Sequence, residues 1–304
     1  MRIFLPTVCI FVASSLDSPA GDAQGDLPYV CGEAVDKNLK GAEFKAALRG
    51  DTCLLGTWLT TSDPMMTEVI ALAGFDFCIL DAEHGPVTAS TALMTQIVAD
   101  RAGVPLLVRI PAIEPAPVMA ALDNGAAGVI VPRVEHPDQA EQAIRLCHYP
   151  PIGSRGFGPR RASGYLRDVN GYLDRAQRST VVIVQVETRG ALDHLDQILA
   201  LPGLDGILVG RNDLANELGL PRDPANPELS AITRDVLRRT RAVGLAAGLA
   251  CGAAPAAAIA ARKLGANLIA AGIDVEFLAR AVDAFLHDSR TLLDTDDTSE
   301  RTRS

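Results

Sequence analysis

The chain has 304 residues, of which 48% are hydrophobic and 21% are charged, and its formal net charge at pH 7 is −9. This balance is typical of a globular protein and excludes a disordered, collagen-like or coiled-coil chain. The net negative charge argues against binding to nucleic acid through a broad basic surface. No stretch reaches the roughly 18 continuous apolar residues that a membrane-spanning helix needs, so integral membrane association is not expected.

The six cysteines indicate the redox environment of the chain. None of them forms a C-x-x-C pair, and their spacing suggests neither a zinc site nor a disulfide framework. Free thiols of this kind fit a reducing compartment. We therefore expect a cytoplasmic protein.

The two ends of the chain differ in pattern from its middle. Residues 1–37 begin with a basic residue, an apolar run and small residues, which is loosely similar to a secretory signal, but a Pro interrupts the run and no clear cleavage site follows. We expect an N-terminal extension that is either disordered or signal-like. Residues 289–304 are polar and rich in Thr and Asp, and we expect a disordered tail there.

Between these ends, short apolar runs alternate with helical patterns. Each run is continuously apolar, which is typical of parallel strands that are covered on both faces. The predicted strands are residues 54–59, 75–81, 104–110, 128–132, 181–187, 205–210, 245–250 and 266–272. The predicted helices, several of which carry Pro near their start, are residues 63–74, 88–103, 114–126, 136–147, 187–201, 226–244 and 253–265.

The number and order of these elements predict the fold class. Eight strands separated by helices are what an α/β chain needs to close a (β/α)8 TIM barrel, here a single domain over residues 38–288. A doubly wound open sheet is the alternative, but no Gly-rich nucleotide-binding turn supports it. Residues 150–178 form a connection too long for a simple loop, and long insertions of this kind are more often functional than idle.

Charged side chains follow the predicted strands at their carboxyl ends. These ends meet at one face of a barrel, which is the face where barrel enzymes place their chemistry. A charged residue that ends an apolar strand is costly unless it is paired or coordinated. The side chains concerned are Asp81, Glu83, His84, Arg109, Glu187 and Asp213.

Each residue also has a structural interpretation. Taken alone, Glu187 is as consistent with an ion pair to an Arg as with a metal ligand, and Asp213 is as consistent with a helix cap. His84 fits a satisfied loop histidine, and Arg109 fits a residue that only neutralises carboxylates. Trp58, at the end of the first strand, either walls a pocket or only packs.

The joint chemistry of these residues is more specific than any one of them. Two carboxylates from neighbouring strands, Glu187 and Asp213, can bind one hard divalent cation and leave positions for water and substrate oxygens. A 2-oxo acid can chelate such a cation, and the guanidinium of Arg109 can stabilise an enolate oxyanion. Asp81 and His84 supply an acid/base pair in which the Asp fixes the imidazole. These are the parts of a metal-dependent aldol lyase.

Six segments form an ordered set that is specific, although each alone is a weak signal. They are GTWLTTSDPMMTEVIALAGFDFCILDAEHG, LVRIP, GVIVPRVE, YPPIGSRGFGPRRA, VQVETRGAL and VGRNDLANELG. On these segments the chain, from about residue 40 to about residue 288, resembles the HpcH/HpaI aldolase family of metal-dependent (class II) pyruvate aldolases.

The resemblance implies a reaction and a cofactor. The chain would cleave a 4-hydroxy-2-oxo acid to pyruvate and an aldehyde through a metal-bound pyruvate enolate. Glu187 and Asp213 would hold a divalent cation, Mg²⁺ or alternatively Mn²⁺ or Co²⁺. Arg109 would bind the pyruvyl oxygen, and His84, oriented by Asp81, would transfer the proton at the aldol hydroxyl.

The resemblance also implies further contacts and an assembly. Gln185 would line the substrate site, and the backbone around Asn212 and Asp213 would receive the pyruvate carboxylate. Apart from the resemblance, the place of Trp58 at the end of the first strand makes it a further candidate for substrate binding. Asp123 would reach the metal site of a neighbouring subunit. The implied assembly is a homohexamer, a trimer of dimers in which the last barrel helix is exchanged.

Arg211 is the main departure from the family, which commonly has Pro at this position. The side chain either adds a charge that favours an acidic substrate or points to solvent, and we favour solvent. Two other functions remain open, which are an acyl-CoA lyase like the citrate lyase β subunits and a catalytically silent barrel that acts as a binding module. The sequence Asp81-Ala82-Glu83-His84 favours the aldolase over the lyase.

Overall fold

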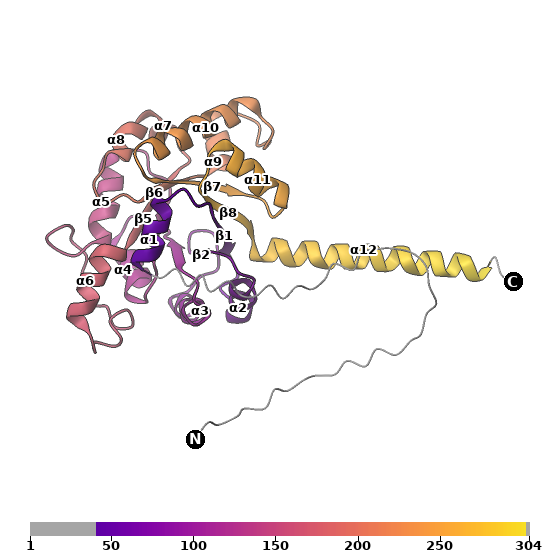
Figure 1. Cartoon of the computed structure of the whole chain (residues 1–304), viewed down its shortest axis with the longest axis horizontal. Helices are drawn as coiled ribbons and strands as arrows, with labels where there is room; N and C mark the ends of the chain where they lie inside the picture. Colours follow the sequence, from indigo (N-terminus) through magenta and orange to yellow (C-terminus); the bar gives the residue numbers. More distant parts are fainter. Residues whose placement is uncertain (1–40, 302–304) are drawn as a thin grey trace, which may run out of the picture. The chain divides into compact units, whose positions relative to one another are not determined.

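The chain forms a closed barrel of eight parallel strands, in which each strand pairs with the next and β8 pairs with β1 (Figure 1). The computed structural model describes residues 41–301, with side chains to residue 294, so the extension predicted over residues 1–37 lies outside the described residues. The strands are β1 Leu54–Leu59, β2 Phe77–Asp81, β3 Leu106–Arg109, β4 Gly128–Val131, β5 Val181–Val186, β6 Gly206–Val209, β7 Ala246–Cys251 and β8 Leu268–Ile273. The (β/α)8 prediction is confirmed.

Helices alternate with the strands, and those between β1 and β8 cover the outside of the barrel (Figure 1). They are α1 Ala42–Arg49, α2 Pro64–Leu72, α3 Ala89–Ala102, α4 Pro115–Asp123, α5 Pro137–Cys147, α6 Val169–Ser179, α7 Arg189–Asp193, α8 Leu195–Leu199, α9 Arg211–Leu218, α10 Pro227–Ala242, α11 Pro255–Leu264 and α12 Asp274–Arg301. The segment predicted as one helix over residues 187–201 is divided at His194, whose backbone (φ −106°, ψ 14°) is not helical. Helix α6 lies mostly within the long connection predicted over residues 150–178.

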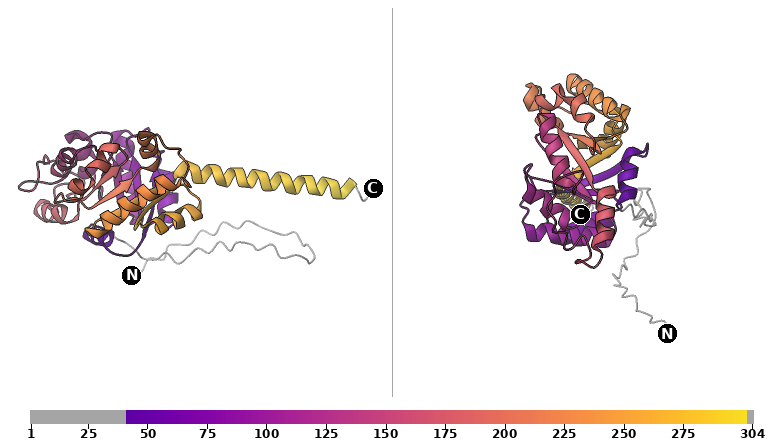
Figure 2. Two further views of the ribbon diagram at one scale, coloured as in Figure 1. Left: turned by 90° about the horizontal axis from the view of Figure 1, so that it is seen from above. Right: turned by 90° about the vertical axis from the view of Figure 1, so that its left-hand side faces the viewer.

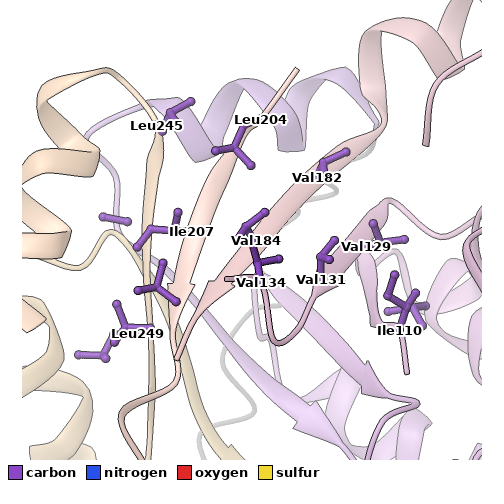
Figure 3. Packing of buried hydrophobic residues seen from close by; sticks show 14 of the residues in the cluster. Ile110, Val129, Val131, Val134, Val182, Val184, Leu204, Ile207, Leu245 and Leu249 are labelled. Atoms are coloured by element: carbon purple, nitrogen blue, oxygen red, sulfur yellow. The ribbon is translucent and has the colours of Figure 1, made fainter. Parts of the chain in front are cut away.

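Apolar side chains fill the inside of the barrel and also the layer between its strands and the covering helices. Ile130 of β4 and Ile183 of β5 belong to the cluster inside the barrel. The residues that alternate with them face the covering helices instead, among them Val129, Val131 and Val184 (Figure 3). Because side chains alternate across a strand, a wall that is buried on both faces requires the continuous apolar runs seen in the sequence.

Helix α1 closes the barrel at the amino ends of the strands. Phe44 and Leu48 are fully buried in the cluster inside the barrel. Beside them, Lys45 and Arg49 form ion pairs of 3.0 and 3.2 Å with the buried carboxylate of Asp205, just before β6. With this end sealed, the carboxyl ends of the strands form the open end of the barrel.

Helix α12 extends well beyond residue 288, where the sequence analysis ended the barrel. It continues to Arg301 without interruption, and Figure 2 shows it leaving the barrel. Over residues 289–301 the structure therefore differs from the disordered tail predicted for residues 289–304. Residues 274–301 contain no Gly or Pro, so their polar composition does not prevent helix formation. None of the helices among the described residues combines the length and the apolar character that crossing a bilayer requires.

Phe44→Ala tests the role of α1 as the barrel base. Removing a fully buried phenyl group leaves a cavity that the strands around it cannot fill, which costs about 3–5 kcal/mol. We expect a loss of this size in the free energy of unfolding, measured by urea denaturation. Phe157→Ala is the control, because the Phe157 side chain is exposed and its loss should change stability by less than about 1 kcal/mol. Equal losses in the two variants would contradict the role of α1.

Candidate active site

The guanidinium of Arg109 lies between two carboxylates at the open end of the barrel. Asp81 and Arg109 are register partners on β2 and β3. Arg109 Nε and Nη2 donate to the two oxygens of Asp81 at 3.0 and 2.6 Å, and Nη1 lies 3.2 Å from Glu83. The ring of Trp58 lies under the guanidinium, 4.6 Å from Arg109 Cζ to the ring centroid. The fork geometry and the stacking fix the orientation of this cation.

Asp81 accepts hydrogen bonds from Arg109 and from the backbone of the loop that follows β2. Its carboxylate accepts hydrogen bonds of 3.1 Å from the amides of Glu83 and His84. Burial alone would raise the pKa of Asp81, but the hydrogen bonds and the charge of Arg109 outweigh this effect and lower it. Asp81 is therefore an ionised carboxylate that orients Arg109.

The imidazole of His84 is placed differently from the sequence expectation. Its side chain is 69% exposed, and its Nε2 lies 3.9 Å from an oxygen of Glu83. Within the described part of the chain, the only hydrogen bond from His84 to Asp81 comes from the backbone amide. The expected ring contact with Asp81 is absent because the two residues stand at either end of a tight turn whose amides point at the carboxylate. The sequence left Glu83 ambiguous, and Glu83 is the carboxylate nearest the imidazole.

Glu187 follows β5 and is buried beside other acidic groups. One of its oxygens accepts a hydrogen bond of 2.8 Å from the amide of Arg133, and the other accepts one from Gln185 Nε2. Burial raises the pKa of Glu187, and the negative charges of Asp213 and Glu83 raise it further. A carboxylate in this situation is stabilised by a nearby cation.

Gly210 brings the start of α9 against this carboxylate. A Cβ at residue 210 would lie 2.7 Å from an oxygen of Glu187 and 2.9 Å from Gln185 Nε2, so only glycine permits the approach. Asn212 and Asp213 are exposed in the first turn of α9, whose start has no side-chain cap. Gly210 is the cap residue of this helix and lies against Glu187, and the amides of a helix start without a side-chain cap can bind an anionic group.

One cavity of about 740 Å³ joins most of the predicted site residues. The predicted residues that line it are Trp58, His84, Arg109, Gln185, Asn212 and Asp213. Asp123 does not line it. Asp123 ends α4 and forms an ion pair of 2.5 Å with Arg155, so within one chain it lies apart from the other site residues.

The donor set fits a hard divalent cation. Glu187 and Asp213 supply carboxylate oxygens from neighbouring elements, and the side-chain carbonyl oxygen of Gln185 is buried with no hydrogen-bond partner in the described structure. Burial is the main cause of the raised pKa of Glu187, and the negative charges of Asp213 and Glu83 add to it. No group of three or more His, Cys, Asp or Glu side chains converges among the described residues. A cation here would therefore need oxygens from substrate and water as further ligands.

Arg211 does not point to solvent, so the prediction that favoured solvent is wrong. Its side chain is half-buried and lines the cavity. Nη2 donates hydrogen bonds of 3.2 Å to the carbonyl of Pro224 and to the hydroxyl of Ser230. Burial lowers the pKa of Arg211. Ser230 and Arg234 of α10 also line the cavity, and no signal in the local sequence identified them, because they reach it through tertiary packing.

The part of the chain that forms the barrel is similar to known proteins. A model of the HpcH/HpaI aldolase/citrate lyase family matches residues 54–281. The hydroxypyruvate/pyruvate aldolase of Roseovarius nubinhibens is 38% identical over 250 residues, which cover 82% of this chain and 96% of that protein. The 4-hydroxy-2-oxovalerate aldolase of Rhodococcus jostii is 38% identical over 244 residues, which cover 79% and 93%.

A solved structure extends this likeness from sequence to fold. An HpcH/HpaI aldolase/citrate lyase family protein from Burkholderia cenocepacia superimposes with a TM-score of 0.77 at 34% identity, covering 82% of this chain and 99% of the other. The matched residues include every strand of the barrel and the loops that carry the site. The chain therefore belongs to the HpcH/HpaI aldolase/citrate lyase family.

Proposed function

We propose that the chain is a class II aldolase, which cleaves the C3–C4 bond of a 4-hydroxy-2-oxo acid to give pyruvate and an aldehyde. The observation that carries this proposal is the convergence of Arg109, Glu187 and Asp213 at the open end of the barrel. The named activities of the relatives from Roseovarius nubinhibens and Rhodococcus jostii support the same reaction class. The partners of the chain are then small molecules, a 2-oxo acid and an aldehyde.

Glu187 and Asp213 would hold the divalent cation, Mg²⁺ or alternatively Mn²⁺ or Co²⁺. When bound, a cation supplies Lewis acidity that polarises a keto oxygen and offsets developing negative charge. Glu187 is held in place by the Arg133 amide and by Gln185, so its free lone pairs keep a fixed direction. The amides at the start of α9, around Asn212 and Asp213, would receive the carboxylate of the 2-oxo acid.

Arg109 would face the oxygen that becomes negative when the C3–C4 bond breaks. Its guanidinium is already oriented by Asp81, Glu83 and Trp58, so no reorganisation is needed as the charge develops. Preorganised charge of this kind stabilises the enolate more than the substrate ketone, and this difference accelerates the reaction.

His84 would accept the proton of the C4 hydroxyl, through a water molecule. Loss of this proton lets the C4–O bond become the aldehyde carbonyl while the electrons of the C3–C4 bond form the enolate. Protonation of the enolate at C3 then gives pyruvate. The exposure of the imidazole leaves it free to exchange the proton with solvent, and an oxygen of Glu83 lies 3.9 Å from its Nε2.

We also propose that two chains exchange α12. Along this helix the apolar side chains of Leu278, Val282 and Phe285 recur at helical spacing and are exposed, Phe285 to 73%. The exposed apolar side chains of α2, including Met65 and Val69, offer a matching surface on a second chain. A trimer of such dimers would bring Asp123 to the site of a neighbouring subunit.

Metal dependence is tested by following pyruvate release from a 4-hydroxy-2-oxo acid. We expect EDTA to abolish the release and Mg²⁺ to restore it. Glu187→Gln should lower kcat/KM by roughly 100-fold or more at fixed Mg²⁺, because cation charge stabilisation contributes several kcal/mol. Glu141→Gln, on the exposed face of α5, is the control and should behave as wild type. Full activity of Glu187→Gln after exhaustive chelation would contradict the metal assignment, and cleavage of an acyl-CoA thioester instead would favour the lyase.

His84→Ala separates the proton step from the formation of the enolate. We expect retro-aldol cleavage to fall by roughly 10²–10⁴, since the aldol hydroxyl loses its proton acceptor. Deuterium exchange into bound pyruvate should fall much less, because it needs only the cation and Arg109. Both rates can be measured by NMR on one preparation. Equal losses in the two rates would show that His84 supports the site without transferring this proton.

If two chains exchange α12, the molar mass of the protein in solution should depend on the apolar face of this helix. Introducing charge with Val282→Asp together with Phe285→Asp should lower the molar mass in light scattering from an oligomer toward the 32.0 kDa protomer. Asp283→Lys, on the exposed polar side of the same helix, should leave the mass unchanged. An unchanged mass in the double variant would contradict the exchange.

A further inference from the structure

A buried carboxylate lies behind the site, where β8 ends and α12 begins. Asp274 is the first residue of α12 and is buried, and it directly follows Ile273, which lines the site cavity. Asp274 is not among the residues that line this cavity, so any effect it has on a ligand there is indirect. A buried carboxylate is costly unless hydrogen bonds replace the water that it has lost.

The connection from β1 to α2 supplies such hydrogen bonds. The backbone amides of Thr60 and Thr61 donate to the Asp274 carboxylate at 2.9 and 3.0 Å, and their hydroxyl groups donate to it at 2.5 and 2.8 Å. Burial alone would raise the pKa of Asp274, but these hydrogen bonds outweigh this effect and lower it. Asp274 is therefore an ionised carboxylate that fixes the two residues after β1.

The same connection contains a residue in an unfavourable backbone conformation. Ser62 is buried and has a φ of 54°, a left-handed value that favours glycine. Its hydroxyl is buried without a hydrogen-bond partner in the described structure. A conformation of this kind persists only where the surrounding structure imposes it. The hydrogen bonds from Thr60 and Thr61 to Asp274 restrain the two residues that precede Ser62.

An irregularity in the pairing of β1 with β8 brings Asp274 to this position. Trp58 pairs with Ile273, one residue later along β8 than the regular register from Gly56 predicts. Such irregularities re-aim the side chains that follow them and are common beside active sites. Here the shift places Asp274, the next residue of the chain, against the end of β1.

Two parts of the site contact the end of β1 and the connection that follows it. Trp58 lies two residues before Thr60, and its ring lies under the guanidinium of Arg109, 4.6 Å from Cζ to the ring centroid. A Cβ at Gly85 would lie 2.9 Å from the carbonyl oxygen of Thr60, so the connection and the loop after β2 pack with no room for a side chain between them. That loop carries His84.

We propose that Asp274 is a positioning residue for the proposed aldolase reaction. Its carboxylate fixes Thr60 and Thr61, and through them it holds the ring of Trp58 under Arg109. Because Arg109 would stabilise the enolate as it forms, loss of Asp274 lowers the rate of bond cleavage rather than the affinity for the 2-oxo acid. The effect on rate rests on the aldolase function proposed above, whereas the effect on the Trp58 ring does not.

The fluorescence of Trp58 tests this role, because it is the single Trp of the chain. We expect Asp274→Ala to shift the emission to longer wavelength and to increase quenching by acrylamide, since a ring that is 7% exposed gains access to water. Thr60→Val removes one donor and keeps the shape of the side chain, so the shift should be smaller and in the same direction. Asp76→Ala is the matched control. Asp76 accepts a hydrogen bond of 2.8 Å from the amide of Leu55 at the opposite end of β1, and its loss should leave the emission unchanged.

Turnover supplies a second readout. Asp274→Ala should lower kcat for pyruvate release by roughly 10- to 100-fold, the effect that a small misplacement of a catalytic group produces, while KM stays close to wild type. In Arg109→Gln the same change should lower kcat little further, because it acts through the guanidinium that is already lost. Asp76→Ala should keep the wild-type kcat.

The outcomes separate this role from a merely structural one and from the aldolase function. Equal emission shifts in Asp274→Ala and Asp76→Ala, or equal losses of kcat with and without Arg109, would overturn the positioning role and leave the aldolase intact. If wild type shows no aldolase turnover, the emission still decides, since a shift confined to Asp274→Ala and Thr60→Val supports the role and unchanged emission overturns it. If Asp274→Ala does not fold, the comparison of Thr60→Val with Asp76→Ala decides in the same way.

Discussion

The pairing of Arg109 with Asp81 organises the open end of the barrel. A guanidinium that is only 10% exposed carries a desolvation cost, which two carboxylates and the face of Trp58 offset together. The same Asp81 carboxylate receives the amides of Glu83 and His84, so the loop after β2 is built around it. The position of the His84 imidazole therefore depends on the ion pair between Asp81 and Arg109, although the imidazole itself is not part of that pair.

Closure of the barrel makes that ion pair possible. Asp81 and Arg109 are register partners at the ends of β2 and β3, and a slip of one residue would turn one side chain into the covering helices. The register is held by the apolar residues on both faces of the wall and by α1, whose Phe44 and Leu48 fill the opposite end. The packing at the closed end and the placement of charged side chains at the open end therefore both depend on the register of the strands.

Much of this arrangement could be predicted from sequence, because continuous apolar runs specify parallel strands and the barrel brings their ends together. What could not be predicted was which charged groups meet. The pairing of His84 depends on the amide directions of one tight turn, and the burial of Arg211 depends on Ser230 of α10, 19 residues away. The length of α12 was missed for another reason. Its last turns are polar, and the exposed Leu292 and Leu293 are too few there to show a helical period.

The charges at the strand ends give the site a direction. Burial raises the pKa of Glu187, the charges of Asp213 and Glu83 raise it further, and the charge of Arg109 acts in the opposite sense. In the proposed reaction, a cation held by Glu187 and Asp213 would offset these carboxylates, and Arg109 would face the developing charge from the other side. The bond that breaks would then lie between two positive charges whose positions are fixed by the barrel. These charges would stabilise the enolate more than the neutral ketone, and this difference is what accelerates the reaction.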